Sequence, residues 1–212
     1  MFDTVTTVLE WFGLCIFSVT GALVASRKQM DITGFALLGC VTGLGGGTFR
    51  DLVLGLTPVS WVEHPSYIMA TLIVACLTFF FAHIPQSRYQ YLLWFDAVGL
   101  ALFAVVGAER ALNASNDPII AVAMGVASAA FGGILRDIIG QEEPVVLSRE
   151  IYITAALAGA VVFVALVRLG VPREIAVGLG FCTGLILRGA GLIWGLSFPR
   201  YQPRPGRPIG KP

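Results

Sequence analysis

The sequence predicts an all-α integral membrane protein with seven transmembrane helices, built as two inverted three-helix repeats followed by a seventh helix. Its composition is the first reason, because 56% of the 212 residues are hydrophobic and only 13% are charged, whereas soluble domains carry about 25% charged residues. The second is a series of seven apolar stretches, each near the roughly 20 residues that a membrane-spanning helix needs. The third is a Gly-Gly-x-x-Arg-Asp motif that occurs at 46–51 and again at 132–137.

The apolar stretches are uniform rather than alternating, which favours helices over the strands of a transmembrane barrel. Charged and turn-forming residues collect in the gaps between them. The expected spans are Thr4–Ser26, Ile32–Phe49, Ser66–Ile84, Tyr91–Ala111, Pro118–Ile139, Ile151–Arg168 and Ile175–Leu196.

The distribution of lysine and arginine predicts the orientation in the membrane. The tail after the last span carries basic residues and no acidic one, namely Arg200, Arg204, Arg207 and Lys211. We therefore expect a multi-pass protein of the cell (inner) membrane with a cytoplasmic C-terminus, and the odd number of spans places the N-terminus outside. The formal net charge is +1 and no basic run lies between aromatic residues, so no nucleic-acid partner is expected.

An internal repeat relates the two copies of the motif, which lie 86 residues apart. The same ungapped offset also matches Gly13 with Gly99, Phe17 with Phe103 and Gly39 with Gly125. Because each copy contains three spans, the second copy enters the membrane in the opposite orientation, as in many transport proteins whose sites lie near the midplane. The chain then divides into residues 1–86 for the first repeat, 87–170 for the second, 171–198 for the seventh helix and 199–212 for a basic, Pro-rich cytoplasmic tail.

Glycine interrupts the second helix of each repeat. The runs are Gly45-Gly46-Gly47 and Gly132-Gly133. Each glycine destabilises a helix by ~1 kcal/mol relative to alanine, so we expect a kink or an unwound stretch. Glycine can instead allow close helix packing. The alternative is that a break exposes carbonyls to an aqueous ion path, and the duplication of the glycines favours this second interpretation.

Three hydroxyl side chains lie near the glycines, namely Thr42, Thr48 and Ser128, and the repeat aligns Thr42 with Ser128. Inside a helix such hydroxyls often bond the preceding turn. They can also line a pore as weak, exchangeable oxygen ligands, which suits ion conduction. We therefore place them with the glycines in a candidate ion pathway.

Charged pairs follow the glycine runs, at Arg50-Asp51 and at Arg136-Asp137. Ionisable groups in a membrane helix are costly and usually face a cavity or a partner. Neighbouring residues of a helix point about 100° apart, so we expect neither arginine to be satisfied by the aspartate that follows it.

The repeat itself offers a partner for each arginine, because Glu10 aligns with Asp96. The first helix of each half begins on the side of the membrane where its second helix ends. We therefore expect two symmetry-related ion pairs, Glu10 with Arg50 and Asp96 with Arg136, one near each membrane face. They either gate ion passage or only hold the helices together, and both interpretations stay open.

The duplicated Gly-Gly-x-x-Arg-Asp motif, the 3+3+1 helix plan and the chain length resemble the prokaryotic branch of the trimeric intracellular cation channel (TRIC) family, whose domain has also carried the label of a glycine transporter. The resemblance extends to about Trp194. It implies a homotrimer in the lipid bilayer, with one ion path inside each protomer lined by the glycine-containing second and fifth helices. It also implies conduction of monovalent cations, chiefly potassium. The Lys-Glu-Gly-Gly-Tyr motif with which animal members bind lipid is absent.

The favoured function is a monovalent cation channel, permeable to potassium with sodium as a second permeant ion. Its selectivity should be modest because the chain lacks the Thr-Val-Gly-Tyr-Gly filter. The alternative is a secondary transporter of a small solute such as glycine, which inverted repeats fit equally well, and a third class is a membrane scaffold. The cysteines, His64 and His83 lack metal-site spacing. No catalytic motif is present either, so we expect no enzyme activity, metal site or cofactor.

Overall fold

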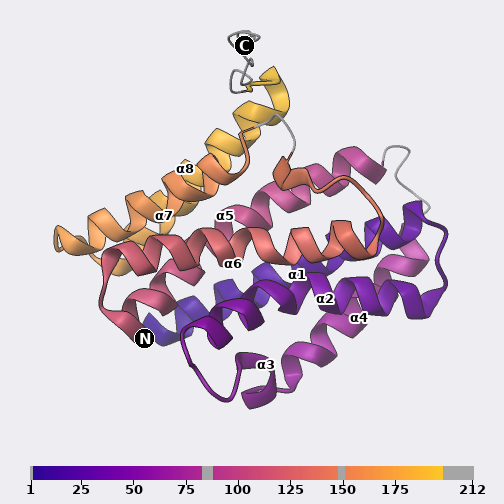
Figure 1. The fold of residues 1–212 in the computed structure, drawn as a ribbon, viewed down its shortest axis with the longest axis horizontal. Coiled ribbons are helices and arrows are strands. Elements are labelled where there is room, and N and C mark those ends of the chain that lie inside the picture. Colours follow the sequence, from indigo (N-terminus) through magenta and orange to yellow (C-terminus); the bar gives the residue numbers. More distant parts are fainter. Residues whose placement is uncertain (1, 83–87, 148–150, 198–212) are drawn as a thin grey trace, which may run out of the picture.

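The computed structural model describes residues 2–82, 88–147 and 151–197, which form a bundle of helices joined by short loops (Figure 1). The α-helices of these residues are α1 (Phe2–Arg27), α2 (Ile32–Val53), α3 (Ser60–Glu63), α4 (Ser66–Phe81), α5 (Arg88–Ser115), α6 (Pro118–Ile139), α7 (Ile153–Arg168) and α8 (Arg173–Trp194). A 3-10 turn, η1, covers Val145–Leu147.

The predicted spans correspond to α1, α2, α4, α5, α6, α7 and α8. Of these, α1, α2, α5, α6 and α8 are long and apolar enough to cross a membrane. α4 and α7 are apolar helices of 16 residues, about 24 Å long at 1.5 Å per residue. The hydropathy pattern did not predict α3 and η1, because elements of three or four residues carry no periodicity. The predicted end of the third span, Ile84, and the basic tail lie outside the described residues.

Equivalent aspartates begin the second helix of each half. Asp31 caps α2 by accepting a hydrogen bond from the Gly34 amide at 2.9 Å. Asp117 caps α6 by accepting from the amides of Ile119 and Ile120, with a proline at the first helical position. Such caps satisfy amides that the first turn of a helix leaves unpaired. Asp31 and Asp117 are separated by the same 86 residues as the two motifs, so the repeat extends to the helix caps.

The two halves run in opposite directions. In Figure 1, α1 runs from left to right and α5 from right to left, and α2 and α6 are opposed in the same way. Phe17 of α1 and Phe103 of α5 stack in the core with ring centroids 5.1 Å apart. These rings are repeat equivalents, so each half contributes the same residue to a shared centre.

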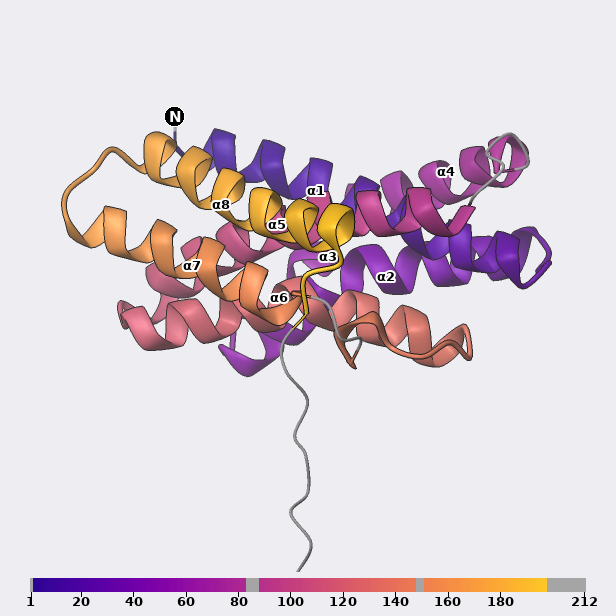
Figure 2. The same cartoon turned by 90° about the horizontal axis from the view of Figure 1, so that it is seen from above.

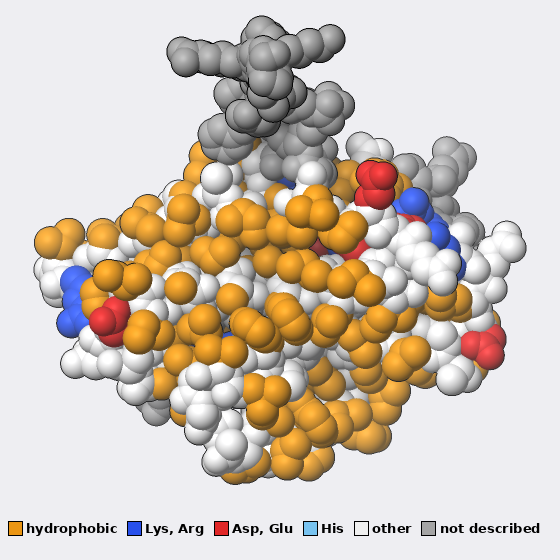
Figure 3. All heavy atoms as spheres, in the orientation of Figure 1, with side chains coloured by type: hydrophobic (Ala, Val, Ile, Leu, Met, Phe, Trp, Pro, Cys, Tyr) orange, Lys and Arg blue, Asp and Glu red, His pale blue; other side chains and the backbone are white. Residues whose placement is uncertain are grey.

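The surface agrees with a bilayer crossed along the long axis of the molecule. Figure 3 shows hydrophobic side chains across the middle of the visible face, while charged side chains gather at its left and right ends. The helices run between these two ends (Figure 1), so apolar side chains cover their middle on this face. This is the arrangement that a hydrocarbon core bounded by two aqueous interfaces requires.

α8 lies beside α7 on one side of the bundle (Figure 2). Gly159 of α7 and Gly180 of α8 face each other, because a Cβ added to either would lie 2.9 Å from the carbonyl oxygen of the other. At the start of α8, Nη1 of Arg173 contacts Oε1 of Glu109 of α5 at 2.5 Å. The seventh helix is therefore attached to the second repeat by close backbone packing and by an ion pair.

The expectation of an unwound stretch at the glycines is wrong, since α2 and α6 are continuous helices through both runs. A Cβ on Gly46 would lie 2.1 Å from the Ser128 carbonyl oxygen, and one on Gly132 would lie 2.4 Å from that of Thr42. The missing side chains let the two helix backbones touch, which is the packing interpretation of glycine. The contact between α2 and α6 compensates for the helix propensity that glycine loses.

Candidate functional site

The first buried charge cluster centres on Arg50 in the last turn of α2. Its side chain is fully buried. Nη2 contacts Oε1 of Glu10 at 3.3 Å and Oδ1 of Asp51 at 2.7 Å, and Nε donates to the same Asp51 oxygen at 2.9 Å. The guanidinium thus joins α1 to the end of α2.

The second cluster centres on Arg136 in the last turn of α6. Nη1 donates to Oδ1 of Asp96 of α5 at 2.8 Å, and Nε donates to Oδ1 of Asp137 at 2.8 Å. All three side chains are buried. The same three-residue arrangement therefore occurs in both halves.

The expectation that each arginine is not satisfied by the aspartate after it is wrong in both halves. The Cα–Cβ bonds of neighbouring helical residues do diverge. An arginine side chain is long enough to bend back across that divergence, so that its guanidinium meets the carboxylate next to it. A rule about backbone direction does not constrain the far end of so flexible a side chain.

Each of these aspartates also fixes the short element that follows its helix. Oδ2 of Asp51 accepts from the Ser60 amide at 2.9 Å and from the Ser60 hydroxyl, at the start of α3. Oδ2 of Asp137 accepts from the Val145 amide at 2.9 Å, at the start of η1. The Arg-Asp pair therefore lies buried at the end of the second helix and fixes the turn that the chain makes there.

The contacts expected from the repeat, Glu10 with Arg50 and Asp96 with Arg136, are both present. Because the halves run in opposite directions, the two clusters lie at opposite ends of the bundle (Figure 1). Removing one member of a buried pair costs about 3–5 kcal/mol, because the other charge loses its compensation. The clusters therefore brace the helices, and a role in gating stays a prediction.

The repeat did not predict Arg110, which joins the first cluster from α5. Its Nη2 contacts Oε2 of Glu10 at 2.5 Å, and its Nη1 lies 3.4 Å from the Ser60 hydroxyl. The hydroxyl of Tyr67 donates to the same Glu10 oxygen at 3.2 Å. The residue 86 positions before Arg110 is Val24, so a search for duplicated charges could not find it.

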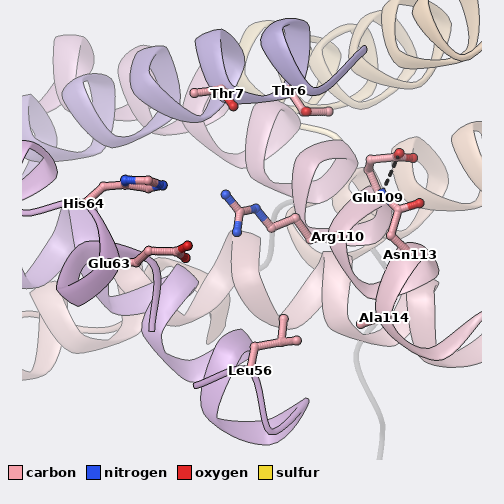
Figure 4. Close-up of a pocket in the computed structure, with 9 residues that line it drawn as sticks. All are labelled: Thr6, Thr7, Leu56, Glu63, His64, Glu109, Arg110, Asn113 and Ala114. Carbon is pink, nitrogen blue, oxygen red and sulfur yellow. Dashed lines mark hydrogen bonds between the residues drawn. The ribbon is translucent and has the colours of Figure 1, made fainter. Parts of the chain in front are cut away.

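A polar pocket of about 440 Å³ opens at this end of the bundle (Figure 4). Figure 4 shows the Arg110 side chain extending into it from α5, with Glu63 and His64 on the opposite side. The lining residues are Thr6, Thr7, Leu56, Glu63, His64, Glu109, Arg110, Asn113 and Ala114. Glu10 is not among them, but Arg110, which lines the pocket, contacts the Glu10 carboxylate at 2.5 Å.

A small cavity of about 20 Å³ borders Glu10. Such a volume holds about one water molecule. Its lining residues are Glu10, Leu14, Gly43, Leu44, Gly47, Thr48, Ser60, Trp61, Tyr67 and Phe103. Glu10 thus contacts Arg110 of the open pocket and itself lines the small cavity beside α2. Phe103, whose ring stacks on Phe17, also lines this cavity.

The predicted ion-pathway glycines separate into two groups. Gly46 and Gly132 lie in the contact between α2 and α6, and a Cβ on Gly45 would lie 3.0 Å from the Leu135 side chain. Gly47 instead lines the small cavity. Its repeat equivalent, Gly133, faces the second cluster, where an added Cβ would lie 3.2 Å from Oη of Tyr152 and 3.6 Å from Oδ1 of Asp96.

Of the predicted hydroxyls, Thr48 is the one that lines the small cavity. Its Oγ1 donates to the Leu44 carbonyl at 2.7 Å and accepts from the Trp61 indole at 2.9 Å. Thr42 is fully buried and donates to the Leu38 carbonyl at 2.6 Å. Ser128 is also fully buried, with its carbonyl against Gly46. Thr42 therefore follows the pattern of bonding the preceding turn.

This arrangement of helices also occurs in solved structures. The trimeric intracellular cation channel orthologue from Rhodobacter sphaeroides is 70% identical in sequence and superposes with a TM-score of 0.89, over 91% of this chain and 100% of that one. The chain belongs to the prokaryotic TRIC family. A structure that describes conductance through TRIC cation channels is 34% identical, with a TM-score of 0.83 over 94% of this TRIC protein and 98% of that chain.

Sequence comparisons agree with this membership. The family model described as "Glycine transporter" matches the TRIC chain twice, at residues 7–83 and 93–168. The two matches begin 86 residues apart, which is the spacing of the internal repeat. The UPF0126 inner membrane protein YadS of Escherichia coli K12 is 38% identical over 195 residues, covering 91% of this chain and 94% of its own.

Proposed function

We propose that this TRIC protein is a cation channel whose ion path lies inside each protomer, between the inverted halves. The observation that carries the proposal is a chain of contacts at the first end. Arg110 lines the open pocket, it forms an ion pair with Glu10, and Glu10 lines the small cavity. Intramembrane ionisable groups of this kind mark ion pathways. The names of the R. sphaeroides orthologue and of the conductance structure support the proposal.

Potassium is the main permeant ion of this proposal and sodium the second. Carboxylates at both ends, Glu10 and Asp96, attract cations, while the arginines beside them limit how tightly a cation is held. Weak binding of this kind lets an ion leave as readily as it enters. The path follows α2 and α6 past Gly47 and Gly133, the two glycines of the runs that border the clusters rather than the contact between the helices.

The gate of this channel is the contact between Arg110 and Glu10. The Arg110 side chain is 31% exposed, whereas that of Arg50 is fully buried. Arg110 can therefore turn outward into the 440 Å³ pocket, where Glu63 offers it another carboxylate (Figure 4). Glu10 would keep Arg50 as a contacting guanidinium, so this movement does not leave its carboxylate without a cationic partner.

The proposed assembly is a homotrimer in the inner membrane, with the N-terminus outside and the C-terminus in the cytoplasm. The R. sphaeroides orthologue is named trimeric, and the E. coli relative is named an inner membrane protein. The orientation rests on the basic residues of the tail.

Planar-bilayer recording of purified protein under potassium and sodium gradients tests the function. Wild-type protein should pass cation currents, and Glu10→Gln should reduce them by removing the carboxylate at the small cavity. The control is Glu142→Gln, because Glu142 pairs with the partly exposed Arg27 and such surface pairs contribute little. Equal loss of current in both variants would contradict the proposed path.

A secondary transporter of glycine is the second candidate, favoured by the description of the matching family model. Inverted repeats occur in such transporters as well. Proteoliposomes decide between the two functions: saturable glycine uptake coupled to an ion gradient, without single-channel currents, would replace the channel by a transporter. A protein that moves neither ions nor glycine would be a scaffold.

A further inference from the structure

The internal repeat supplies each end of the bundle with more negative than positive charge. Each cluster contains two carboxylates and one guanidinium from its own half. The first has Glu10, Asp51 and Arg50, and the second has Asp96, Asp137 and Arg136. An uncompensated buried charge costs several kcal/mol. A second positive charge at each end would therefore be strongly stabilising.

At the first end this charge comes from Arg110, at 2.5 Å from Glu10. The repeat does not place an arginine at the equivalent position of the second end. The position equivalent to Arg110 is Val24 of α1, which is fully buried, and a Cβ added to Gly140 would lie 2.6 Å from its side chain. An arginine would not fit there, so the second end needs a donor from outside the duplicated helices.

α8 carries such a donor, Arg188, which is fully buried. Its guanidinium lies over the ring of Tyr152, 5.1 Å from the centroid, and Nη1 lies 3.3 Å from the Ile151 carbonyl oxygen. Tyr152 is also buried, and a Cβ added to Gly133 would lie 3.2 Å from its hydroxyl oxygen and 3.6 Å from Oδ1 of Asp96. The ring stands beside Gly133, at the place that Tyr67 occupies beside Glu10 in the first half.

We propose that Arg188 is the counterpart of Arg110: a positioning residue, supplied by the helix outside the repeat, that balances the Asp96–Arg136–Asp137 cluster and holds Tyr152 beside the ion path. The role beside an ion path rests on the proposed channel function. The charge balance does not depend on it. A guanidinium is attracted electrostatically to an aromatic face, and the attraction is stronger when both groups are removed from water.

The two ends then differ in mobility. Arg110 borders a polar pocket and has room to move, while Arg188 is enclosed between α8 and Tyr152. The end that contains Arg110 can open, and the end that contains Arg188 stays fixed. The seventh helix thus has a function in each protomer that three-helix duplication alone could not provide.

Charge compensation tests the proposal. Arg188→Gln leaves the second cluster with excess negative charge, and adding Asp96→Asn restores the original balance. Current–voltage curves in symmetric potassium chloride should show a change in rectification of roughly twofold for Arg188→Gln. The double variant should bring the rectification back toward wild type while passing less current, because Asp96 also attracts cations in the proposed path, and Arg188→Lys should stay close to wild type. The matched control is Arg168→Gln, because Arg168 is exposed at the end of α7. This substitution should change neither the rectification nor the Tm.

Thermal unfolding in detergent gives a readout that needs no current. Arg188→Gln should lower Tm by roughly 5 °C or more, and Asp96→Asn should recover part of that loss. Arg188→Gln with wild-type Tm and rectification would overturn the inference. The inference would also be overturned if Glu150→Gln lowered Tm as much as Arg188→Gln does and Asp96→Asn did not compensate for Arg188→Gln. Glu150 precedes Ile151 in the chain, so this result would assign the charge of Arg188 to Glu150 and not to the cluster. If wild-type protein passes no current, the channel proposal fails and the melting curves alone decide the inference.

Discussion

Replacing Gly46 by alanine should destabilise the protein although alanine is the better helix former. The added Cβ would lie 2.1 Å from the Ser128 carbonyl oxygen. Because the obstacle is backbone, α2 and α6 must move apart by roughly 1 Å to reach an ordinary contact distance. Overpacking of this kind costs up to about 3 kcal/mol, and alanine returns about 1 kcal/mol of helix propensity. The expected net loss is therefore about 2 kcal/mol.

Gly47 is the matched control, one residue further along the same helix. The nearest atom to a Cβ added there is Nη2 of Arg50, at 3.8 Å, which is an ordinary contact. Gly47→Ala should therefore stabilise the helix by up to about 1 kcal/mol. The new methyl group would also enter the small cavity, so this variant should pass less current while being at least as stable as wild type.

Thermal unfolding in detergent measures the difference. At roughly 2–4 °C per kcal/mol for a chain of this size, Gly46→Ala should melt about 4–8 °C below wild type, and Gly47→Ala should melt at or above it. The reasoning is refuted if Gly46→Ala melts with wild type, because α2 and α6 would then not touch through their backbones. It is also refuted if the two variants lose stability equally.

Three further predictions concern the charge clusters and the caps. Arg110→Ala should raise open probability in planar bilayers, because Glu10 loses its 2.5 Å partner, and Arg110→Lys should keep the gate; a silent Arg110→Ala channel would count against gating. Asp51→Asn should lose about 3–5 kcal/mol, since Asp51 binds both Arg50 and the Ser60 amide, and size-exclusion chromatography should show a reduced yield of folded protein. Asp31→Ala and Asp117→Ala should each cost about 1 kcal/mol through a lost cap, visible as similar decreases in Tm.

The features that sequence could predict are those carried by composition and by the repeat. Apolar length predicted the spans, and α6 begins and ends at the predicted residues. The offset of 86 aligned Glu10 with Asp96, and topology then placed each acid level with an arginine. This succeeded because a pseudo-symmetric fold repeats its buried contacts, so that one pair predicts the other.

The residues that sequence missed are those at which the symmetry fails. Arg110 replaces a valine of the first half, and Arg188 lies in a helix without a counterpart. Tyr67 and Tyr152 are 85 residues apart rather than 86, because the connection after Asp137 reaches η1 one residue sooner than the connection after Asp51 reaches α3. An ungapped comparison therefore misaligned the two tyrosines.

The sequence alone could not predict the role of the glycines, because a glycine run has the same composition whether it breaks a helix or allows two helices to pack closely. What separates the two cases is the neighbouring backbone, as at Gly46 and Ser128. The glycine that borders the first cluster, Gly47, differs from Gly46 by one residue and by about 100° around the helix. One face of α2 is therefore fixed against α6, while the adjacent face borders the cavity.

The distribution of partners around Glu10 is the reason for proposing that the first end is the one that opens. Its carboxylate contacts two guanidinium groups, Arg50 and Arg110, whereas the Asp96 carboxylate contacts Arg136. Arg50 is held by Asp51 and is fully buried, so Glu10 keeps one guanidinium contact when Arg110 leaves. Breaking the Asp96–Arg136 contact would instead deprive Asp96 of an arginine 2.8 Å away, at a cost of several kcal/mol. We therefore propose that the two nearly identical clusters differ in function because Arg110 at the first end is partly exposed to water, whereas Arg188 at the second end is buried.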